Sequence, residues 1–154
     1  MRELEVRRHA RRDPRADRLT PEGRIQAEEL GRSLGTPFAV IFVSPAERAA
    51  ETVALVLRGM GAEPSPHEVV ASLAGLGEGG QEPERMAAVL HELLALVPEG
   101  SRGLAVGHTP LIERAVEALT GVEIDPLGEC EGVLLTQGDD LRLSVEELRS
   151  GPAA

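Results

Sequence analysis

Two histidines and two arginines stand where short strand-like segments of this 154-residue chain give way to polar residues. His9 follows Arg8 at the end of one such segment, His108 follows the apolar run 103–106, and Arg48 comes shortly after another run. Imidazole is a competent nucleophile near neutral pH, and guanidinium groups bind phosphoryl oxygens in pairs. If these strands are neighbours, the four side chains would form a phosphoryl-transfer site that needs no metal ion.

Taken one at a time, these residues are weak evidence of a site. A lone histidine after a strand is more often structural than catalytic, and Arg48 could merely pair with Glu47 or Glu51 on its own helix. His67, beside a proline, and His91, on the flank of an amphipathic helix, are expected to have no direct function. The prediction therefore depends on the whole set meeting in one pocket.

Strand-like and helix-like segments alternate along the chain, which indicates an α/β layer architecture. We expect a single three-layer α/β/α domain over 1–154, with a mostly parallel central sheet, helices on both faces and no large cap insertion. The expected strands cover 3–8, 38–43, 67–73, 103–106, 132–136 and 141–145, and the expected helices cover 20–34, 44–58, 83–97 and 110–120.

Two of the expected helices begin with a capping signal directly after a strand or loop. Thr20 precedes Pro21 at the first helical position, and the segment 44–47 (Ser-Pro-Ala-Glu) has the pattern of a capping box. Ligands of open α/β sheets bind outside the carboxyl ends of the strands, where helix N-termini present unpaired N–H groups. An anion site is therefore expected at this edge of the sheet.

Composition excludes several other kinds of site. The single cysteine, Cys130, rules out an internal disulfide and a multi-cysteine zinc site, and the absence of lysine rules out Schiff-base chemistry. With two Phe and no Tyr or Trp, stacking platforms for nucleic-acid bases are not expected. No apolar run approaches the about 18 residues of a membrane span, so we expect a cytoplasmic protein without membrane contact.

The charge of the chain is unevenly distributed around a net value of −10. Residues 1–24 carry eight Arg and five acidic residues, whereas the remainder carries eight Arg and 21 acidic residues. A concentrated arginine cluster on an acidic background indicates a local anion site rather than a field for a polyanion. The alternatives are an N-terminal arm that touches nucleic acid, or a solvated surface; we expect no nucleic-acid partner.

Four blocks of the sequence resemble one known family, the histidine phosphatase superfamily, and within its phosphoglycerate-mutase-like group the small SixA-type phosphohistidine phosphatases. Arg8-His9-Ala10 is similar to the Arg-His-Gly signature, and 18–27 to the Leu-Thr-x-x-Gly-x-x-Gln-Ala helix start. The segment 44–52 is similar to Ser-Pro-x-x-Arg-Ala-x-x-Thr, and Gly107-His108 to the second catalytic histidine. These blocks follow the order of the family and cover the chain from residue 4 to about 120.

The resemblance implies roles for individual residues. His9 corresponds to the phosphorylated nucleophile, and Arg8, Arg48 and His108 correspond to the rest of the phosphate pocket. Arg18 is a further expected anion contact. No cofactor and no metal ion are implied, and the expected partner is a phosphorylated small molecule or a phosphohistidine protein.

The sequence departs from the family at two places. Ala10 stands where the family has glycine, and the region of the general acid in larger members reads Leu-Gly-Glu-Gly-Gly over 76–80, which leaves Glu78 as a candidate acid. SixA-type proteins lack a dedicated acid here, since a phosphoramidate leaving group is basic. We therefore expect a SixA-like phosphatase with a phosphohistidine intermediate. The alternatives are a phosphatase for a sugar or nucleotide-precursor phosphate, a phosphoglycerate mutase, and a non-catalytic phosphate-binding module.

Overall fold

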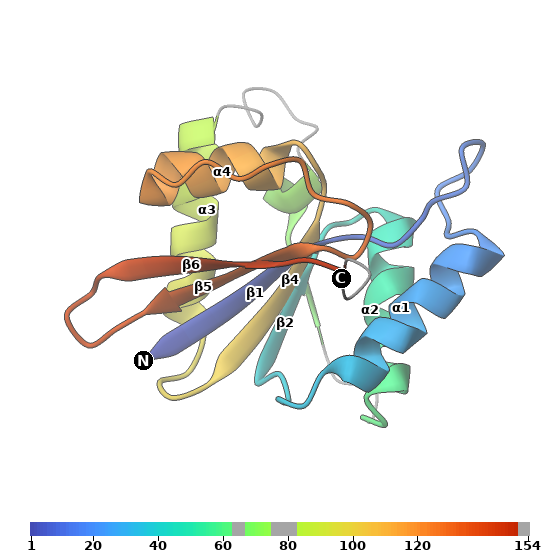
Figure 1. The fold of residues 1–154 in the computed structure, drawn as a ribbon, viewed down its shortest axis with the longest axis horizontal. Helices are drawn as coiled ribbons and strands as arrows, with labels where there is room; N and C mark the ends of the chain where they lie inside the picture. The colour runs from blue at the N-terminus through green and yellow to red at the C-terminus, as the bar shows by residue number, and fades with distance from the viewer. Residues whose placement is uncertain (63–66, 75–82, 151–154) are drawn as a thin grey trace.

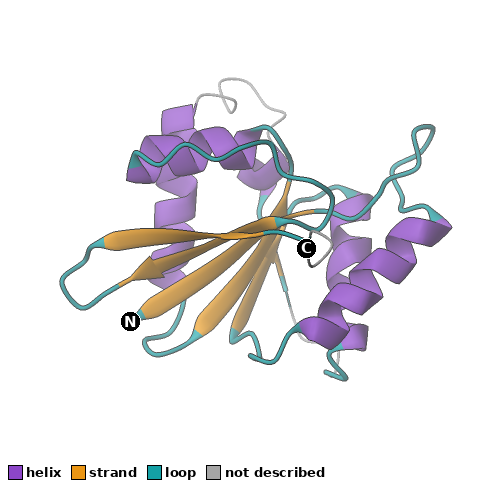
Figure 2. Cartoon of the chain, viewed as in Figure 1, coloured by secondary structure: helices purple, strands orange, loops and turns teal. Residues whose placement is uncertain are grey.

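A computed structural model describes residues 1–62, 67–74 and 83–150 of the chain. In this part a six-stranded sheet is flanked by four α-helices and one 3-10 turn (Figures 1 and 2). The strands are β1 (Arg2–Arg8), β2 (Val40–Val43), β3 (Glu68–Val69), β4 (Arg102–Gly107), β5 (Gly132–Gln137) and β6 (Leu143–Leu148); the helices are α1 (Pro21–Ser33), α2 (Glu47–Gly59), α3 (Pro83–Leu96), α4 (Leu111–Thr120) and the turn η1 (Ala71–Ala74).

The sheet has the strand order β3-β2-β4-β1-β5-β6. The first four strands in this order run parallel, whereas β5 is antiparallel to both β1 and β6. Arg8 pairs with Gly107 at the end of β1 and β4, and Val43 pairs with Val106 at the end of β2 and β4. The three strands therefore end at the same level, and the residues that follow them lie at one edge.

Helices cover both faces of this sheet. The pair α1 and α2 packs together on one side, and the pair α3 and α4 on the other (Figure 1). Neighbouring side chains of β2 point to opposite faces of the sheet. Phe42 packs in the cluster that holds Leu90 and Ile112. Ile41 packs in the cluster that holds Val53. The predicted three-layer α/β/α fold with a mostly parallel sheet is confirmed.

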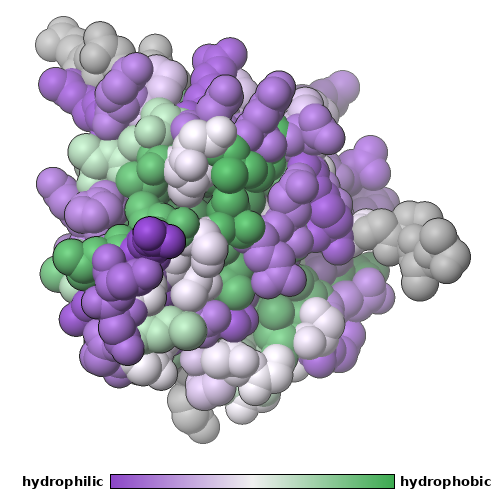
Figure 3. All heavy atoms as spheres, turned by 60° about the vertical axis from the view of Figure 1, so that its left-hand side comes forward, coloured by the Kyte–Doolittle hydropathy of each residue, from purple (hydrophilic) through white to green (hydrophobic). Residues whose placement is uncertain are grey.

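Partly buried hydrophobic side chains lie where α4 contacts the last strand, β6. Leu119 of α4 and Leu143 and Val145 of β6 are partly buried and pack against the core cluster that α3 and α4 cover. Figure 3 brings the left-hand side of Figure 1 forward and shows hydrophobic surface near its centre, bordered by hydrophilic side chains.

Helices α1 and α2 approach each other at backbone contact because glycines face the partner helix. A Cβ atom on Gly31 would lie 2.1 Å from the carbonyl oxygen of Val56, and one on Gly59 would lie 2.0 Å from that of Glu28. No side chain larger than hydrogen fits at either place without movement of the backbone. The tight pairing holds α2, which carries Arg48, firmly against its neighbour.

The two predicted helix caps differ in outcome. The Thr20 cap is confirmed, since its Oγ1 accepts a hydrogen bond from the Gly23 N–H at 3.0 Å. The capping box at 44–47 is wrong: α2 begins at Glu47, and its N-cap residue Ala46 makes no side-chain cap bond. A carboxylate from a distant loop takes over this task.

The weak strand predicted at 67–73 is shorter than expected. Only Glu68–Val69 pairs with β2, and the chain then turns into η1, where Leu73 is buried. The last strand begins at Leu143 instead of 141, because Leu141 has a positive φ of 65° within the turn that joins β5 and β6.

Candidate active site

The strand ends bring the two predicted histidines side by side. His9 follows β1 and His108 follows β4, and the backbone N–H of His9 donates to the carbonyl of Gly107 at 3.3 Å. The centroids of the two imidazole rings lie 5.2 Å apart with an interplanar angle of 61°. Both side chains are buried. Residues separated by about 100 positions in the sequence thus share one pocket.

Arg48 joins the two imidazoles through a single guanidinium. Its Nε lies 3.3 Å from Nε2 of His9, and its Nη2 lies 3.3 Å from Nδ1 of His108. The third nitrogen, Nη1, forms an ion pair with Asp17 at 2.9 Å. A planar cation that touches both rings marks where an anion with several oxygens would bind.

The hydrogen bonds fix the tautomer of each ring, because a guanidinium can only donate and a carbonyl can only accept. Nδ1 of His9 lies 2.7 Å from the carbonyl oxygen of Ala10, so Nδ1 carries the proton. Nε2 of His9 faces Arg48 and therefore holds a lone pair. The predicted arrangement, in which backbone holds the other ring nitrogen of His9, is confirmed.

The same argument applies to His108. Its Nδ1 accepts from Arg48, so its Nε2 carries the proton and donates to Oγ of Ser44 at 2.7 Å. Ser44 thus orients the second imidazole instead of completing a capping box. Its Oγ also accepts from the N–H of Ala46 at 3.3 Å.

Both histidines are neutral in the free protein at neutral pH. Burial lowers the pKa of His9 below its ordinary value of 6.5, the hydrogen bond to Ala10 raises it in part, and the charges of Arg48, Arg8 and Arg12 lower it. Burial, together with the charge of Arg48, lowers the pKa of His108 to about 4. The imidazole of His9 therefore holds its lone pair available.

The two arginines that end β1 differ in their contacts. Arg7 is buried in an ion pair with Glu5 at 2.6 Å and also binds the carbonyl of Cys130. Arg8 donates from Nη1 to the carbonyl of Leu127 at 2.9 Å, whereas its buried Nε has no hydrogen-bond partner among the described residues. An unpaired buried donor costs about 1–3 kcal/mol, which is typical of a group kept for a ligand.

Glu113 and Arg8 bind the backbone of the same residue, Leu127. Its Oε2 accepts from the backbone N–H of Leu127 at 3.3 Å, and its other carboxylate oxygen, also buried, has no partner within the described ranges. Glu113 lies in the first turn of α4, shortly after His108. The sequence pattern alone placed no function on this residue.

Thr52 connects the segment after His9 to the helix that carries Arg48. Its Oγ1 accepts from the N–H of Ala10 at 3.1 Å and donates to the carbonyl of Arg48 at 2.8 Å. The methyl group of Ala10, which stands where the family has glycine, is fully buried in a cluster with Leu19. The departure from the family pattern is therefore accommodated by packing.

Two predicted site residues are not part of this group. Arg18 is exposed and forms an ion pair with Asp13 at 3.2 Å. No contact joins it to His9 or Arg48 in the described part of the chain. Glu78 lies outside the described residues.

Asp17 is the functional residue that the sequence analysis missed. Its carboxylate accepts from the backbone N–H groups of Glu47 and Arg48 at 2.9 and 3.1 Å, and it pairs with the Arg48 side chain. Partial burial raises the pKa of Asp17, but these hydrogen bonds outweigh it and the net pKa is lowered. Asp17 is thus an ionised cap of α2 that also positions Arg48.

Replacing Asp17 with alanine is expected to lower the free energy of unfolding by about 1 kcal/mol, as is typical for a lost N-cap. Asparagine at this position also caps helices well and should lose much less. Urea denaturation of the two variants measures the difference. Equal stability of the alanine variant and the wild type would contradict the capping role.

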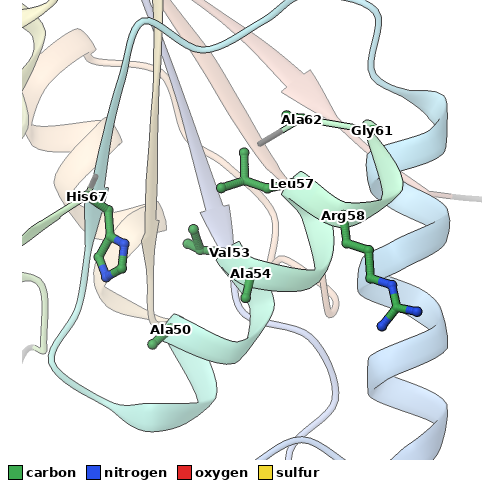
Figure 4. A pocket seen from close by; sticks show the side chains of 8 residues that line it. All are labelled: Ala50, Val53, Ala54, Leu57, Arg58, Gly61, Ala62 and His67. Atoms are coloured by element: carbon green, nitrogen blue, oxygen red, sulfur yellow. The ribbon is translucent and has the colours of Figure 1, made fainter. Parts of the chain in front are cut away.

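An apolar groove of about 570 Å³ along α2 is separate from this pocket. Its lining includes Val53, Leu57, Arg58 and His67 (Figure 4). The Arg58 side chain extends toward α1, away from His67, so the two polar groups do not converge. This groove lacks the geometry of a phosphate site.

Within the described residues, no group of three His, Cys, Asp or Glu side chains is arranged to hold a metal ion. None of the helices in the described ranges is long and apolar enough to cross a membrane. Cys130 is buried, and burial raises its pKa to about 12, so it is a packing thiol rather than a nucleophile.

Several solved structures share this fold. The protein histidine phosphatase SixA complexed with tungstate is 22% identical, with 96% of each chain covered and a TM-score of 0.70. Phosphoserine phosphatase from Entamoeba histolytica in complex with 3-phosphoglyceric acid is 16% identical, with 98% of each chain covered and a TM-score of 0.79. Phosphoglycerate mutase from Bacillus anthracis is 19% identical over 95% of this chain and 92% of that chain, with a TM-score of 0.77. The fold is therefore phosphoglycerate-mutase-like.

A family model matches part of the sequence. Residues 3–75 match the histidine phosphatase superfamily (branch 1), a segment that includes His9 and Arg48. The resemblance to the histidine phosphatase superfamily is thus confirmed. No curated protein matches the sequence.

Proposed function

We propose that the chain is a metal-independent phosphatase, one domain over 1–154, that forms a covalent phosphohistidine on His9. The observation that carries the proposal is the orientation of this imidazole. Nδ1 is held by the Ala10 carbonyl, so the lone pair of Nε2 points to the guanidinium of Arg48. The proposed nucleophilic atom, Nε2 of His9, therefore faces the guanidinium that would bind the phosphoryl oxygens. The superfamily match supports a phosphate-hydrolysing enzyme.

The reaction has two steps. In the first, Nε2 of His9 attacks phosphorus in line, a P–N bond forms and the bond from phosphorus to the leaving group breaks. In the second, water attacks the phosphohistidine, the P–N bond breaks and inorganic phosphate leaves. Arg8 and Arg48 stabilise the phosphoryl oxygens by hydrogen bonds and positive charge in both steps. His108 is neutral in the free protein and donates to a phosphoryl oxygen only once a proton has moved to its Nδ1 beside the bound anion.

The substrate class that we propose is a phosphohistidine protein. Asp17, whose charge acts on His108, is ionised and bound to Arg48, so its carboxylate is unsuited to protonate a leaving group. A phosphoramidate nitrogen is basic and takes its proton from water or from the substrate itself. Similarity to the histidine phosphatase SixA agrees with this choice, although it concerns the fold alone.

A phosphomonoester of a small metabolite is the second candidate. Phosphoserine phosphatase and a putative α-ribazole-5′-phosphate phosphatase from Escherichia coli share the fold at 16% and 17% identity. The rate on a phosphohistidine protein, compared with rates on phosphoserine and a panel of sugar phosphates, separates the two. We expect kcat/KM to be highest on the phosphohistidine protein; a higher value on any metabolite favours the second candidate.

The pH dependence of kcat/KM should follow the ionisation of His9 in the free enzyme. The nucleophile must be neutral, and its pKa lies below the ordinary 6.5. After correction for substrate ionisation, kcat/KM should therefore be level from pH 8 down to about 6.5 and fall only at lower pH. An acidic limb centred above pH 6.5 would contradict the described environment of His9.

A further inference from the structure

The loop between β1 and α1 stands beside the candidate site and projects past the helices (Figure 1, blue). We name residues 11–18 the arginine loop. Its base is closed by a bridge between Arg12 and Leu19 and by the N–H of Thr20, which donates to the carbonyl of Arg11 at 3.0 Å. These backbone contacts give the loop a defined position next to the pocket.

The arginine loop carries more positive than negative charge on its surface. Asp13 forms an ion pair with Arg18. Asp17 forms an ion pair with Arg48 and caps the N-terminus of α2. The other three arginines of the loop are exposed and form no ion pair with any described residue. They are Arg11, Arg12 and Arg15. Cations left unpaired on a protein of net charge −10 are available to an acidic partner.

The rest of the chain has the opposite charge. Beyond residue 24 there are eight Arg and 21 acidic residues, so most of the surface repels an acidic partner. An acidic surface that approaches the protein is attracted mainly at the arginine loop. Such a charge arrangement orients the partner and raises the association rate more than it adds contact energy.

The arginine loop is connected to the reacting groups at two points. Asp17, near its end, contacts Arg48 directly at 2.9 Å. Arg12 is close enough that its charge contributes to lowering the pKa of both His9 and His108. A partner bound to the loop would therefore have its nearest residues at the phosphate pocket.

We propose that the arginine loop docks an acidic protein surface that borders the phosphorylated residue of the substrate. This proposal rests on the proposed function and deepens it, because it names the recognition outside the pocket. A compact acidic patch fits three neighbouring guanidiniums. A long polyanion such as nucleic acid would also meet the acidic remainder of the protein surface. The protein, with two Phe and no Tyr or Trp, offers few aromatic side chains on which bases could stack.

The test uses two phosphohistidine peptides that differ only in several flanking residues, which are Glu in one and Gln in the other. The wild-type protein at low salt should have a kcat/KM about tenfold higher on the Glu peptide, and high salt should remove this preference. The variant R11E/R15E should lose the preference. Both side chains are exposed, and the hydrogen bonds that anchor these positions come from the backbone. R11Q/R15Q provides a milder change with the same expected direction.

The matched control is R58E/R142E, which changes the net charge equally. Arg58 and Arg142 are 75% and 90% exposed and lie outside the arginine loop. The control should keep the preference for the Glu peptide. Turnover of p-nitrophenyl phosphate should be unchanged in R11E/R15E, because this substrate has no flanking residues.

Three results would overturn the docking proposal: no preference in the wild type, an unchanged preference in both loop variants, or loss of preference in the control as well. Stronger inhibition of the wild type by a short DNA duplex than by an acidic peptide would assign the loop to nucleic acid instead. Failure of the proposed function looks different, because p-nitrophenyl phosphate would then not be hydrolysed at all.

Discussion

Replacement of His9 by alanine is expected to reduce turnover of p-nitrophenyl phosphate by about 10⁴-fold or more, as for loss of a covalent nucleophile in other enzymes. The imidazole supplies the only protein atom that the mechanism bonds to phosphorus. Arg8, Arg48 and His108 would still bind the anion, so KM should change much less than kcat. Steady-state kinetics of the purified variant measures both values.

The control for this variant is His91→Ala, which removes an exposed imidazole from α3. It should keep wild-type activity. Circular dichroism and the urea midpoint should show that His9→Ala is folded, since its backbone bond to Gly107 does not require the side chain. A folded His9→Ala variant with full activity would dispose of the nucleophile assignment.

Replacement of Arg48 by alanine should lower kcat by about 10²–10³-fold, the usual cost of removing a preorganised charge donor from a transition state. The effect should be large because one guanidinium contacts both imidazoles at 3.3 Å. Lysine should restore little of the loss, since an ammonium is a point charge and lacks the planar fork that reaches both rings.

The Arg48→Ala variant should also shift the pH profile in a defined direction. The charge of Arg48 lowers the pKa of His9, so its removal raises that pKa and moves the acidic limb of kcat/KM to higher pH. Arg58→Ala, on the same helix but 75% exposed, is the matched control and should change neither value. If the acidic limb of kcat/KM in Arg48→Ala stays at the wild-type pH, the charge of Arg48 does not act on His9, and the described contact is contradicted.

The meeting of His9, Arg48 and His108 was predictable because it depends on topology rather than on side-chain detail. Each residue follows the carboxyl end of a strand, and parallel neighbours end at one edge of a sheet. The registers of β1, β2 and β4 align these ends. Backbone hydrogen bonding therefore did most of the placement.

The polar contacts within the site were less predictable, because they depend on side chains from distant segments. The local pattern at 44–47 predicts a self-contained cap, yet Asp17 caps α2 and Ser44 binds His108. An ionised carboxylate that also pairs with Arg48 outcompetes a serine hydroxyl for the first N–H groups of the helix. Arg18 shows the opposite outcome, because it pairs with a local residue and not with the distant pocket. Its guanidinium forms an ion pair with Asp13, five positions away.

The most direct measurement traps the intermediate. The enzyme is mixed with ³²P-labelled substrate, quenched rapidly in alkali and digested, and the labelled peptide is sequenced. The mechanism requires label on the protein that survives alkali, is lost in acid and maps to the peptide containing His9. Rapid turnover with no labelled protein, or label on any other residue, would contradict a phosphohistidine at this position.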